Sequence, residues 1–210
     1  GEGDRERPCR GGVGGGEEWF GDCSREMACV FSQEIAVMRF RAGSMKSTER
    51  SALKVHSGAL LLNSTRLIVD SKCVFGEGVV LRGDLCDDPC TFEISKRVIL
   101  CPEVICKPAL LRSFQGFQYA DFTIGENVYI GQGSIVQSIC VGHGTYIGPR
   151  SVLGNGSIIG IGCFIEEGSI IPPGCTIPDF QVVRGVPAKC VGDAPECMLE
   201  LMRQYTKEYH

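Results

Sequence analysis

The sequence lacks both a long apolar run and a strong excess of one charge. No stretch approaches the ~18 consecutive apolar residues that a transmembrane helix needs. The formal net charge is -4 over 210 residues, which is too small to draw nucleic acid or an anionic membrane. We therefore expect a soluble protein with no nucleic-acid partner and no membrane insertion.

Histidine and paired metal ligands are also scarce. The histidines are His56, His143 and His210. They lie too far apart in the sequence to form a metal triad within one chain. The cysteines include no Cys-x-x-Cys, and the nearest pairs, Cys86/Cys90 and Cys101/Cys106, lack the second half of a zinc site. We expect neither a metal nor another cofactor.

Nothing at the start of the sequence resembles a signal peptide. The 13 cysteines would suggest disulfides in a small secreted domain, but without that signal we expect reduced thiols in a cytoplasmic protein. Residues 1–50 are rich in glycine and charge and show little hydrophobic periodicity. We expect this extension to be disordered and assign it no function.

Glycine, by contrast, is abundant: 28 residues, about twice the usual share of ~7%. The glycines accompany a six-residue repeat, because every sixth residue from Val141 onward is aliphatic. The series is Val141, Ile147, Leu153, Ile159, Ile165, Ile171, Ile177 and Val183. Neither the 3.6-residue period of a helix nor the alternation of a strand gives this spacing.

This repeat is typical of a coil with a triangular cross-section, in which three short strands make one turn of about 18 residues. We predict an all-β fold: a single-stranded left-handed parallel β-helix over residues 53–190, of the hexapeptide-repeat, trimeric LpxA-like class. Each aliphatic residue points inward, and glycine allows close backbone corners. The small residues four places later also point inward: Thr145, Ser151, Ser157, Cys163, Ser169 and Cys175.

The same logic predicts further inward residues. We expect Cys140, Cys163 and Cys175 to be compact core residues rather than reactive thiolates. Upstream of Val141 the repeat predicts three more inward series. They are Ile124, Ile130 and Val136; Ile94, Leu100 and Cys106; and Ile68, Val74 and Val80.

Two insertions interrupt the repeat, at residues 85–93 and 108–123. Insertions in repeat proteins lie on one face, often the binding face. After the repeat, residues 193–210 predict an amphipathic helix, with Asp193 as N-cap and Pro195 in the first turn. Such a helix would cap the flank of the β-helix. A helix that binds a partner is the alternative.

Some motifs resemble the gamma-class carbonic anhydrases. They are Arg82-Gly83-Asp84, the run from Ile124 to Gln137, and Gly185 to Lys189. The three histidine positions of that family fall at Lys107, Gln132 and Gln137. An ammonium and two amides hold zinc poorly, so this comparison predicts no zinc chemistry. Arg82 and Asp84 are expected to form an ion pair between coils or at an interface.

Residues Gly185 to Lys189 also resemble the end of hexapeptide acyltransferases. Their chemistry usually needs a histidine general base in an extended loop. Neither insertion contains a histidine. The motif itself is a weak signal, since Gly and Pro also turn a chain out of its last coil.

A third resemblance, over about 150 residues, is to the dynactin subunit 5 family, non-catalytic hexapeptide proteins of the dynactin pointed end. It rests on Arg82 to Leu85, on Lys107-Pro108 and the insertion leading into Phe122, and on the tail from Pro195 to Tyr209. The residues from Cys86 to Pro89 depart from that pattern.

This resemblance implies a structural and interaction subunit, not an enzyme, in the cytoplasm and cytoskeleton. The implied partners are dynactin subunit 6, the pointed-end actin-related protein, dynactin subunit 4 and the cargo adaptors of dynein, in microtubule-based transport. The residues expected at contacts are Lys107, Arg112, Phe114, Phe117, Phe122, Met198, Met202 and Tyr205. Core packing is the alternative for each aromatic residue.

A different class of function stays open beside this one. The chain would then be a carbonic-anhydrase-like protein without its own zinc site, or an acyltransferase. Metal content and oligomeric state distinguish the two classes, because sites of the carbonic anhydrase family lie between identical subunits.

Overall fold

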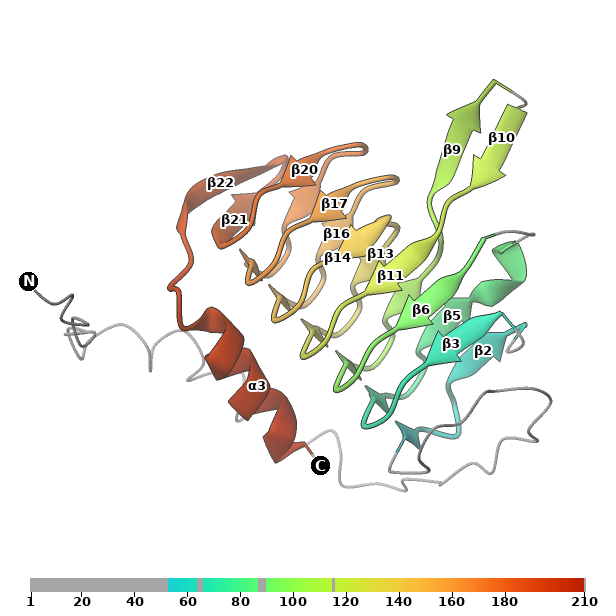
Figure 1. Cartoon of the computed structure of the whole chain (residues 1–210), viewed down its shortest axis with the longest axis horizontal. Helices are drawn as coiled ribbons and strands as arrows, with labels where there is room; N and C mark the ends of the chain where they lie inside the picture. The colour runs from blue at the N-terminus through green and yellow to red at the C-terminus, as the bar shows by residue number, and fades with distance from the viewer. Residues whose placement is uncertain (1–52, 64–65, 87–89, 115, 210) are drawn as a thin grey trace, which may run out of the picture. The chain divides into compact units, whose positions relative to one another are not determined.

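A computed structural model describes residues 53–63, 66–86, 90–114 and 116–209. The extension expected at residues 1–50 lies outside this range. Within the described residues, short strands wind into a coil whose three faces are parallel sheets (Figure 1). No helix among them has the length and apolar character needed to span a membrane.

Face A is the sheet that starts each coil. Its strands, in sheet order, are β1 (Lys54–Val55), β4 (Val74–Phe75), β7 (Ile99–Leu100), β12 (Tyr129–Ile130), β15 (Tyr146–Ile147), β18 (Phe164–Ile165), β21 (Gln181–Gly185) and β22 (Ala188–Asp193). All pairs are parallel except β21 with β22. That antiparallel pair is a hairpin that turns the chain out of the coil.

Faces B and C follow in every coil. Face B comprises β2 (Leu60–Leu62), β5 (Val80–Arg82), β8 (Ile105–Cys106), β13 (Ile135–Val136), β16 (Val152–Leu153) and β19 (Ile170–Ile171). Face C comprises β3 (Leu67–Val69), β6 (Phe92–Ile94), β11 (Phe122–Ile124), β14 (Cys140–Val141), β17 (Ile158–Ile159) and β20 (Thr176–Ile177). The chain therefore makes six full coils, numbered here from coil 1 at β1 to coil 6 at β18.

The aliphatic repeat lines the interior as predicted. Every member of the series from Val141 to Val183 is at most 3% exposed, and so are the two series that begin at Ile124 and Ile94. These side chains stack coil upon coil, since Ile124 pairs with Val141 and Val141 with Ile159. The left-handed β-helix class is confirmed.

The predicted register of the earliest series is wrong by one residue. Ile68 is 53% exposed and pairs with Glu93, whereas Val69 pairs with the inward Ile94. Likewise Phe75 and Leu81, not Val74 and Val80, align with the inward residues of the next coil. Two neighbouring apolar residues occur at each of these sites, so aliphatic spacing alone permits both phases.

The inward small positions also hold, with two exceptions. Thr145, Ser151, Ser157, Cys163 and Ser169 are completely buried. Cys175 is half-buried. Cys140 does not occupy an inward position: it pairs with Ile158 on the outer side of face C. The five-residue step before Val141 shifts the chain here, and the buried Ser138 bonds to Ser157 in its place.

The insertions both lie at the corner between faces B and C. The first begins with a 3-10 turn (η1, Gly83–Leu85). The second forms an antiparallel hairpin of β9 (Leu110–Ser113) and β10 (Gly116–Tyr119), which projects beyond the coil (Figure 1). Its root is closed by a bond from the Ala120 N–H to the Ala109 carbonyl, 2.9 Å.

The C-terminal helix forms, but later than expected. Helix α3 spans Met198–Glu208, and its N-cap is Cys197. Asp193 instead ends β22, where its carboxylate accepts from the Gln181 amide at 2.9 Å. Pro195 lies before the helix, in a turn that its carbonyl closes with the Met198 N–H. The extra hairpin of β21 and β22 explains the delay.

Prolines end two of the three sheets. In inner coils, the N–H that follows an inward aliphatic residue donates to the next coil, as from Gly154 to the Ile171 carbonyl, 2.9 Å. In coil 6 the same position is Pro172 on face B and Pro178 on face C. Proline has no N–H, so these edges cannot extend the ladder there.

Candidate functional site

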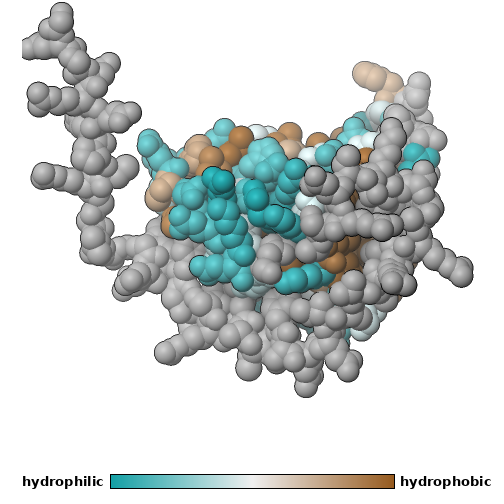
Figure 2. Space-filling view, turned by 60° about the horizontal axis from the view of Figure 1, so that its bottom comes forward, coloured by the Kyte–Doolittle hydropathy of each residue, from teal (hydrophilic) through white to brown (hydrophobic). Residues whose placement is uncertain are grey.

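Face A is covered by the chain's own helix. Its outward aromatic rings form a stack, with Tyr129 5.0 Å from Tyr146, and Tyr146 4.8 Å from Phe164. Tyr205 of α3 meets this stack edge-on, 5.5 Å from Tyr129. Figure 2 shows the outward side of α3 as a hydrophilic patch. Face A is therefore internal surface, closed by α3.

Face B carries an aliphatic column on its outer side. The residue before each inward position is Leu60, Val80, Ile105, Ile135, Val152 or Ile170, one from each coil. Leu60 is 56% exposed and Ile170 39%, and the four between them are half-buried within the flat sheet. No described element covers this column. An uncovered aliphatic stripe of this length is typical of a protein interface.

Face C is different, because its outer column alternates in character. It reads Ile68, Glu93, Thr123, Cys140, Ile158 and Thr176. A glutamate and two threonines interrupt the apolar residues. Of the three faces, only face B is both apolar along its whole length and uncovered within the described structure.

The flanks of the aliphatic column are flat or polar. On the side toward face A, coils 2, 4 and 6 have glycines with positive φ: Gly78, Gly133 and Gly168. Coils 3 and 5 have Glu103 and Arg150 in the same conformation, at φ 61 and 54. On the opposite side lie Arg82, Lys107 and Gln137 in consecutive coils. The face is thus narrow, with an apolar centre and with charged residues or glycines at its edges.

The three positions that align with the histidines of the carbonic anhydrases all fall on face B or at its edges. Lys107 and Gln137 are neighbours in coils 3 and 4, while Gln132 lies at the opposite edge of coil 4. No group of three His, Cys, Asp or Glu side chains in the described residues can hold a metal ion. The donor set on this face fits a protein contact better than a cation.

Arg82 and Asp84 do form an ion pair. The Arg82 Nε lies 2.8 Å from Asp84 Oδ1, and Nη2 lies 2.9 Å from Oδ2. This bond lowers the pKa of Asp84 and raises the pKa of Arg82. Both residues belong to one coil, so the expectation of a bridge between coils is wrong. The pair instead fixes the turn that enters the first insertion.

The β9–β10 hairpin presents exposed aromatic side chains. Phe114 at its tip is fully exposed and Phe117 is 76% exposed. Arg112, opposite Phe117 in the hairpin ladder, is exposed as well. A two-stranded hairpin is marginally stable on its own. Exposed rings on such an element suit a binding surface.

A single asparagine anchors this hairpin to the coils. The Asn155 side chain accepts from the Leu110 N–H and donates to the Leu110 carbonyl, both at 2.8 Å. Leu111 also packs against Gly156, where an added Cβ would lie 3.1 Å from its Cδ2. Coil 5, two coils away from the coil that carries the hairpin, therefore helps to hold it in place.

Three of the residues expected at partner contacts are buried within this chain. Phe122 is completely buried, and its ring lies 4.3 Å from that of Phe92. Met198 is 2% exposed and Met202 is completely buried, because they form the inner side of α3. Tyr205 packs on Tyr129. These side chains pack within the chain, whereas Lys107, Arg112, Phe114 and Phe117 stay accessible.

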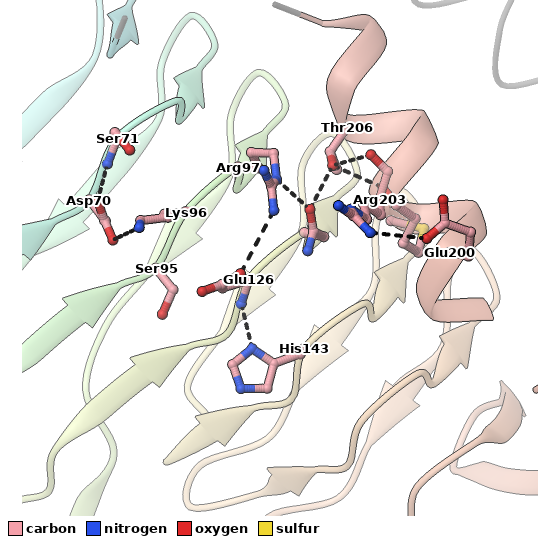
Figure 3. Close-up of polar contacts among 12 residues, drawn as sticks. Asp70, Ser71, Ser95, Lys96, Arg97, Glu126, His143, Glu200, Arg203 and Thr206 are labelled. Atoms are coloured by element: carbon pink, nitrogen blue, oxygen red, sulfur yellow. Dashed lines mark hydrogen bonds and ion pairs between the residues drawn. The ribbon is translucent and has the colours of Figure 1, made fainter. Parts of the chain in front are cut away.

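A polar network ties α3 to the corner between faces C and A (Figure 3). The Asn127 side-chain oxygen accepts from Arg97 Nε at 2.6 Å and from Thr206 Oγ1 at 3.2 Å. The Glu126 N–H donates to His143 Nδ1 at 2.8 Å. His143 is therefore an exposed residue that links two coils through its ring nitrogen.

A groove of about 560 Å³ runs beside this network, between the corner and the first half of α3. Its walls carry Glu126, His143, Glu200 and Arg203. Two of these charges are already engaged, since Arg203 lies 3.5 Å from Glu200. The groove holds no nucleophile with an adjacent base, so its geometry offers no catalytic constellation.

The buried cysteines are chemically quiet. Burial raises the pKa of Cys73 to about 12 and raises the pKa of Cys163 and Cys106 as well. A thiol that stays protonated is a poor nucleophile. The expected core role of Cys163 agrees with this.

The aliphatic column of face B was not predicted from the sequence. Its signal is present, because the residue before each inward position can be read from the same six-residue repeat. On face B these residues are all aliphatic, whereas on face C they are mixed. This difference between faces B and C appears only when the strands of one face are compared with each other, which requires the coil register.

Comparison with known proteins adds two findings. The model of a protein family described as dynactin subunit 5 matches residues 38–210. Among solved structures, a hexapeptide transferase family protein from Anaplasma phagocytophilum matches with a TM-score of 0.57 and 21% identity, over 74% of this chain and 87% of that one. A maltose O-acetyltransferase from Clostridium difficile matches with a TM-score of 0.41 and 21% identity, over 68% and 66%. The first likeness shows the fold alone.

Proposed function

Because the chain belongs to the dynactin subunit 5 family, we propose that it is a non-catalytic structural and interaction subunit of the dynactin pointed end. In this role it supports the engagement of dynein and its cargo adaptors in microtubule-based transport. It acts in the cytoplasm, on the cytoskeleton. Its work is to hold other proteins in place.

The uncovered aliphatic column of face B carries this proposal. Its six residues present a level apolar surface about 29 Å long, since neighbouring strands lie ~4.8 Å apart. Another flat sheet packs on such a surface at ~10 Å. The partner that fits it best is a second hexapeptide subunit, dynactin subunit 6.

The β9–β10 hairpin supplies a second contact. Phe114, Phe117 and Arg112 are exposed at a fixed position beyond the corner of faces B and C. Aromatic and arginine side chains are enriched at the energetic centres of interfaces. We assign them to the pointed-end actin-related protein or to dynactin subunit 4, with Lys107 at the border of the two surfaces.

A co-purification experiment tests the role of face B. The full chain is co-expressed with tagged dynactin subunit 6, and the retained amount is measured for the wild type and for Ile135→Asp. The aspartate places a charge in the centre of the aliphatic column, so retention should fall at least tenfold. The matched control is Thr123→Asp, which puts the same charge at the equivalent position of face C.

Two outcomes would contradict the proposal. One is an equal loss with both variants while circular dichroism shows both to be folded. The other is stoichiometric zinc together with a homotrimer in the purified wild type, which would favour the carbonic-anhydrase-like alternative. An activity assay with acetyl-CoA and a panel of sugar and amine acceptors should give no turnover.

A further inference from the structure

Coil 3 differs from the other coils in having charged residues of opposite sign at the two edges of face B. Its outward residues are Glu103, Ile105 and Lys107, which alternate with the completely buried Val104 and Cys106. A carboxylate therefore lies at one edge of the face and an ammonium at the other. The aliphatic column runs between them.

These two charges have no ionic partner within the described chain. The ion pairs of the structure involve other residues, such as Arg82 with Asp84 and Arg150 with Glu167. Glu103 also adopts a positive φ of 61, where Gly78 and Gly133 fill the equivalent place in adjacent coils and Arg150, with a φ of 54, fills it in coil 5. A charged residue in that conformation carries a backbone cost that glycine avoids.

We propose that face B pairs with face B of a second copy of this chain, with the two coil axes parallel and in register. A two-fold axis along the coil direction turns the edge with Glu103 onto the edge with Lys107 of the second copy. Two ion pairs then form in coil 3, one on each side of the axis, as an isologous interface requires.

The edges of the other coils fit the same arrangement by size. A larger residue at one edge meets a glycine at the other: Arg82 meets Gly78 in coil 2, and Gln137 meets Gly133 in coil 4. The same holds for Leu62 with Gly58, Pro172 with Gly168 and Arg150 with Gly154. All six coils are therefore self-complementary in charge or in shape.

The opposite orientation loses both kinds of fit. Turning one copy end for end brings coil 3 against coil 4, so that Lys107 faces Gln137 and Glu103 faces Gly133. No ion pair forms, and glycine meets glycine where coil 1 faces coil 6. The charges of coil 3 thus select parallel over antiparallel pairing.

The size of the face predicts a reversible dimer. A surface of about 29 Å by about 17 Å gives roughly 500 Å² from each copy, at the low end for a specific interface. We expect association in the micromolar range, as for other small interfaces. This dimer and the complex with dynactin subunit 6 use the same face, so formation of the dimer competes with formation of that complex. This competition rests on the proposed function.

Sedimentation equilibrium of the full chain alone tests the pairing. The wild type should show a monomer–dimer equilibrium in the micromolar range. Glu103→Lys and Lys107→Glu each turn both ion pairs of the interface into pairs of like charge. Each variant should therefore weaken the dimer at least tenfold. The double swap, E103K with K107E, restores opposite charges and should return dissociation to within about threefold of the wild type.

Charge reversals elsewhere serve as controls. Glu93→Lys on face C and Lys189→Glu on β22 change the same charges on exposed residues and should leave the dimer unchanged. A wild type that stays monomeric at 100 µM would overturn the pairing, as would a double swap no better than its single variants. Because subunit 6 is absent, such failure leaves the face B result with Ile135→Asp untouched.

Discussion

At the scale of single residues, the spacing between coils decides which side chains are allowed. Gly131 follows the inward Ile130, and an added Cβ there would lie 2.4 Å from the backbone nitrogen of Pro149 in the next coil. No rotamer relieves a clash with backbone. The abundance of glycine in this sequence therefore reflects contact between coils as well as turn conformation.

Gly131→Ala should accordingly destabilise the protein by about 3 kcal/mol, because the coils must separate locally to admit the methyl group. Urea unfolding followed by circular dichroism measures the change. Gly192→Ala is the control, since nothing lies within 4 Å of the Cβ it would add. Equal stability of the two variants would show that the coil spacing adapts.

The buried thiols make stability depend on alkaline pH. An unfolded thiol titrates near 8.5, while burial raises the pKa of Cys73 to about 12. Between these values the unfolded chain releases a proton that the folded chain keeps. The contribution of these thiols to stability should therefore be constant below about pH 8 and fall above it, by up to ~1.4 kcal/mol per pH unit for each such thiol.

Urea unfolding at pH 7.5, 8.5 and 9.5 checks this slope. Cys73→Ala should make it shallower, whereas Cys190→Ser should not, because Cys190 is exposed. Stability that rises with pH over this range would contradict the assignment.

Single residues also distinguish the register of the first coils. Phe75 is followed by Gly76, whose added Cβ would lie 2.7 Å from the Pro102 nitrogen. Inward residues such as Val141 are followed by glycine in the same way. That neighbour distinguishes Phe75 from Val74 where aliphatic spacing does not.

At the scale of elements, α3 is bound to face A by aromatic contacts together with the buried methionines of its inner side. Tyr205 lies edge-on to Tyr129 and to Tyr209, each at 5.5 Å. Tyr205→Ala removes both contacts and should cost about 2 kcal/mol. Hydrogen exchange of the α3 amides should accelerate, while exchange in β15 and β16 stays slow.

Gln204→Ala is the matched control for this helix, since Gln204 is exposed and bonds only to Glu200, 3.2 Å away. It should leave exchange in α3 unchanged. Faster exchange through the whole coil stack with Tyr205→Ala would instead mean that α3 is part of the folding core rather than a cover.

Elements outside the repeat were predicted less well than those within it. The pattern of Met198 and Met202 predicted the helix correctly. Its predicted start was wrong, because Asp193 belongs to the hairpin of β21 and β22 and bonds to Gln181 there. The hairpin of β9 and β10 was foreseen only as an insertion. Its anchor, Asn155, lies two coils away, a distance that no local pattern reports.

At the scale of the whole molecule, the coil stack and its protruding hairpin are separable. The Ala120 N–H already bonds to the Ala109 carbonyl at the root. Replacing residues 110–119 by Gly-Gly should change the melting temperature by less than about 5 °C, because the residues removed bury little apolar surface.

The same deletion should abolish binding of the partner that contacts Phe114 and Phe117, while subunit 6 remains bound through face B. Thermal unfolding and co-purification measure the two effects on one preparation. The control is Phe114→Ser with Phe117→Ser, which leaves the hairpin backbone in place. A large drop in melting temperature would show that the hairpin supports the coils.

The architecture of the molecule was predictable because the six-residue period repeats many times, so that single errors do not matter. Its binding face was not predictable in the same way. Face B is distinguished by residues such as Ile105 and Ile135, which lie 30 positions apart and become neighbours only through the coil register. The sequence contains that information, but only in relation to the three-dimensional winding.

Pro172 and Pro178 give the molecule a fixed length. A parallel coil has no intrinsic reason to stop, since each turn offers the next a ladder of the same geometry. The missing N–H donors lie in the last turn, so they end the sheets there whatever the number of turns before it. An additional turn inserted upstream would therefore lengthen the rod by about 4.8 Å and still end cleanly, so members of this architecture can evolve by changing their turn number without becoming filaments.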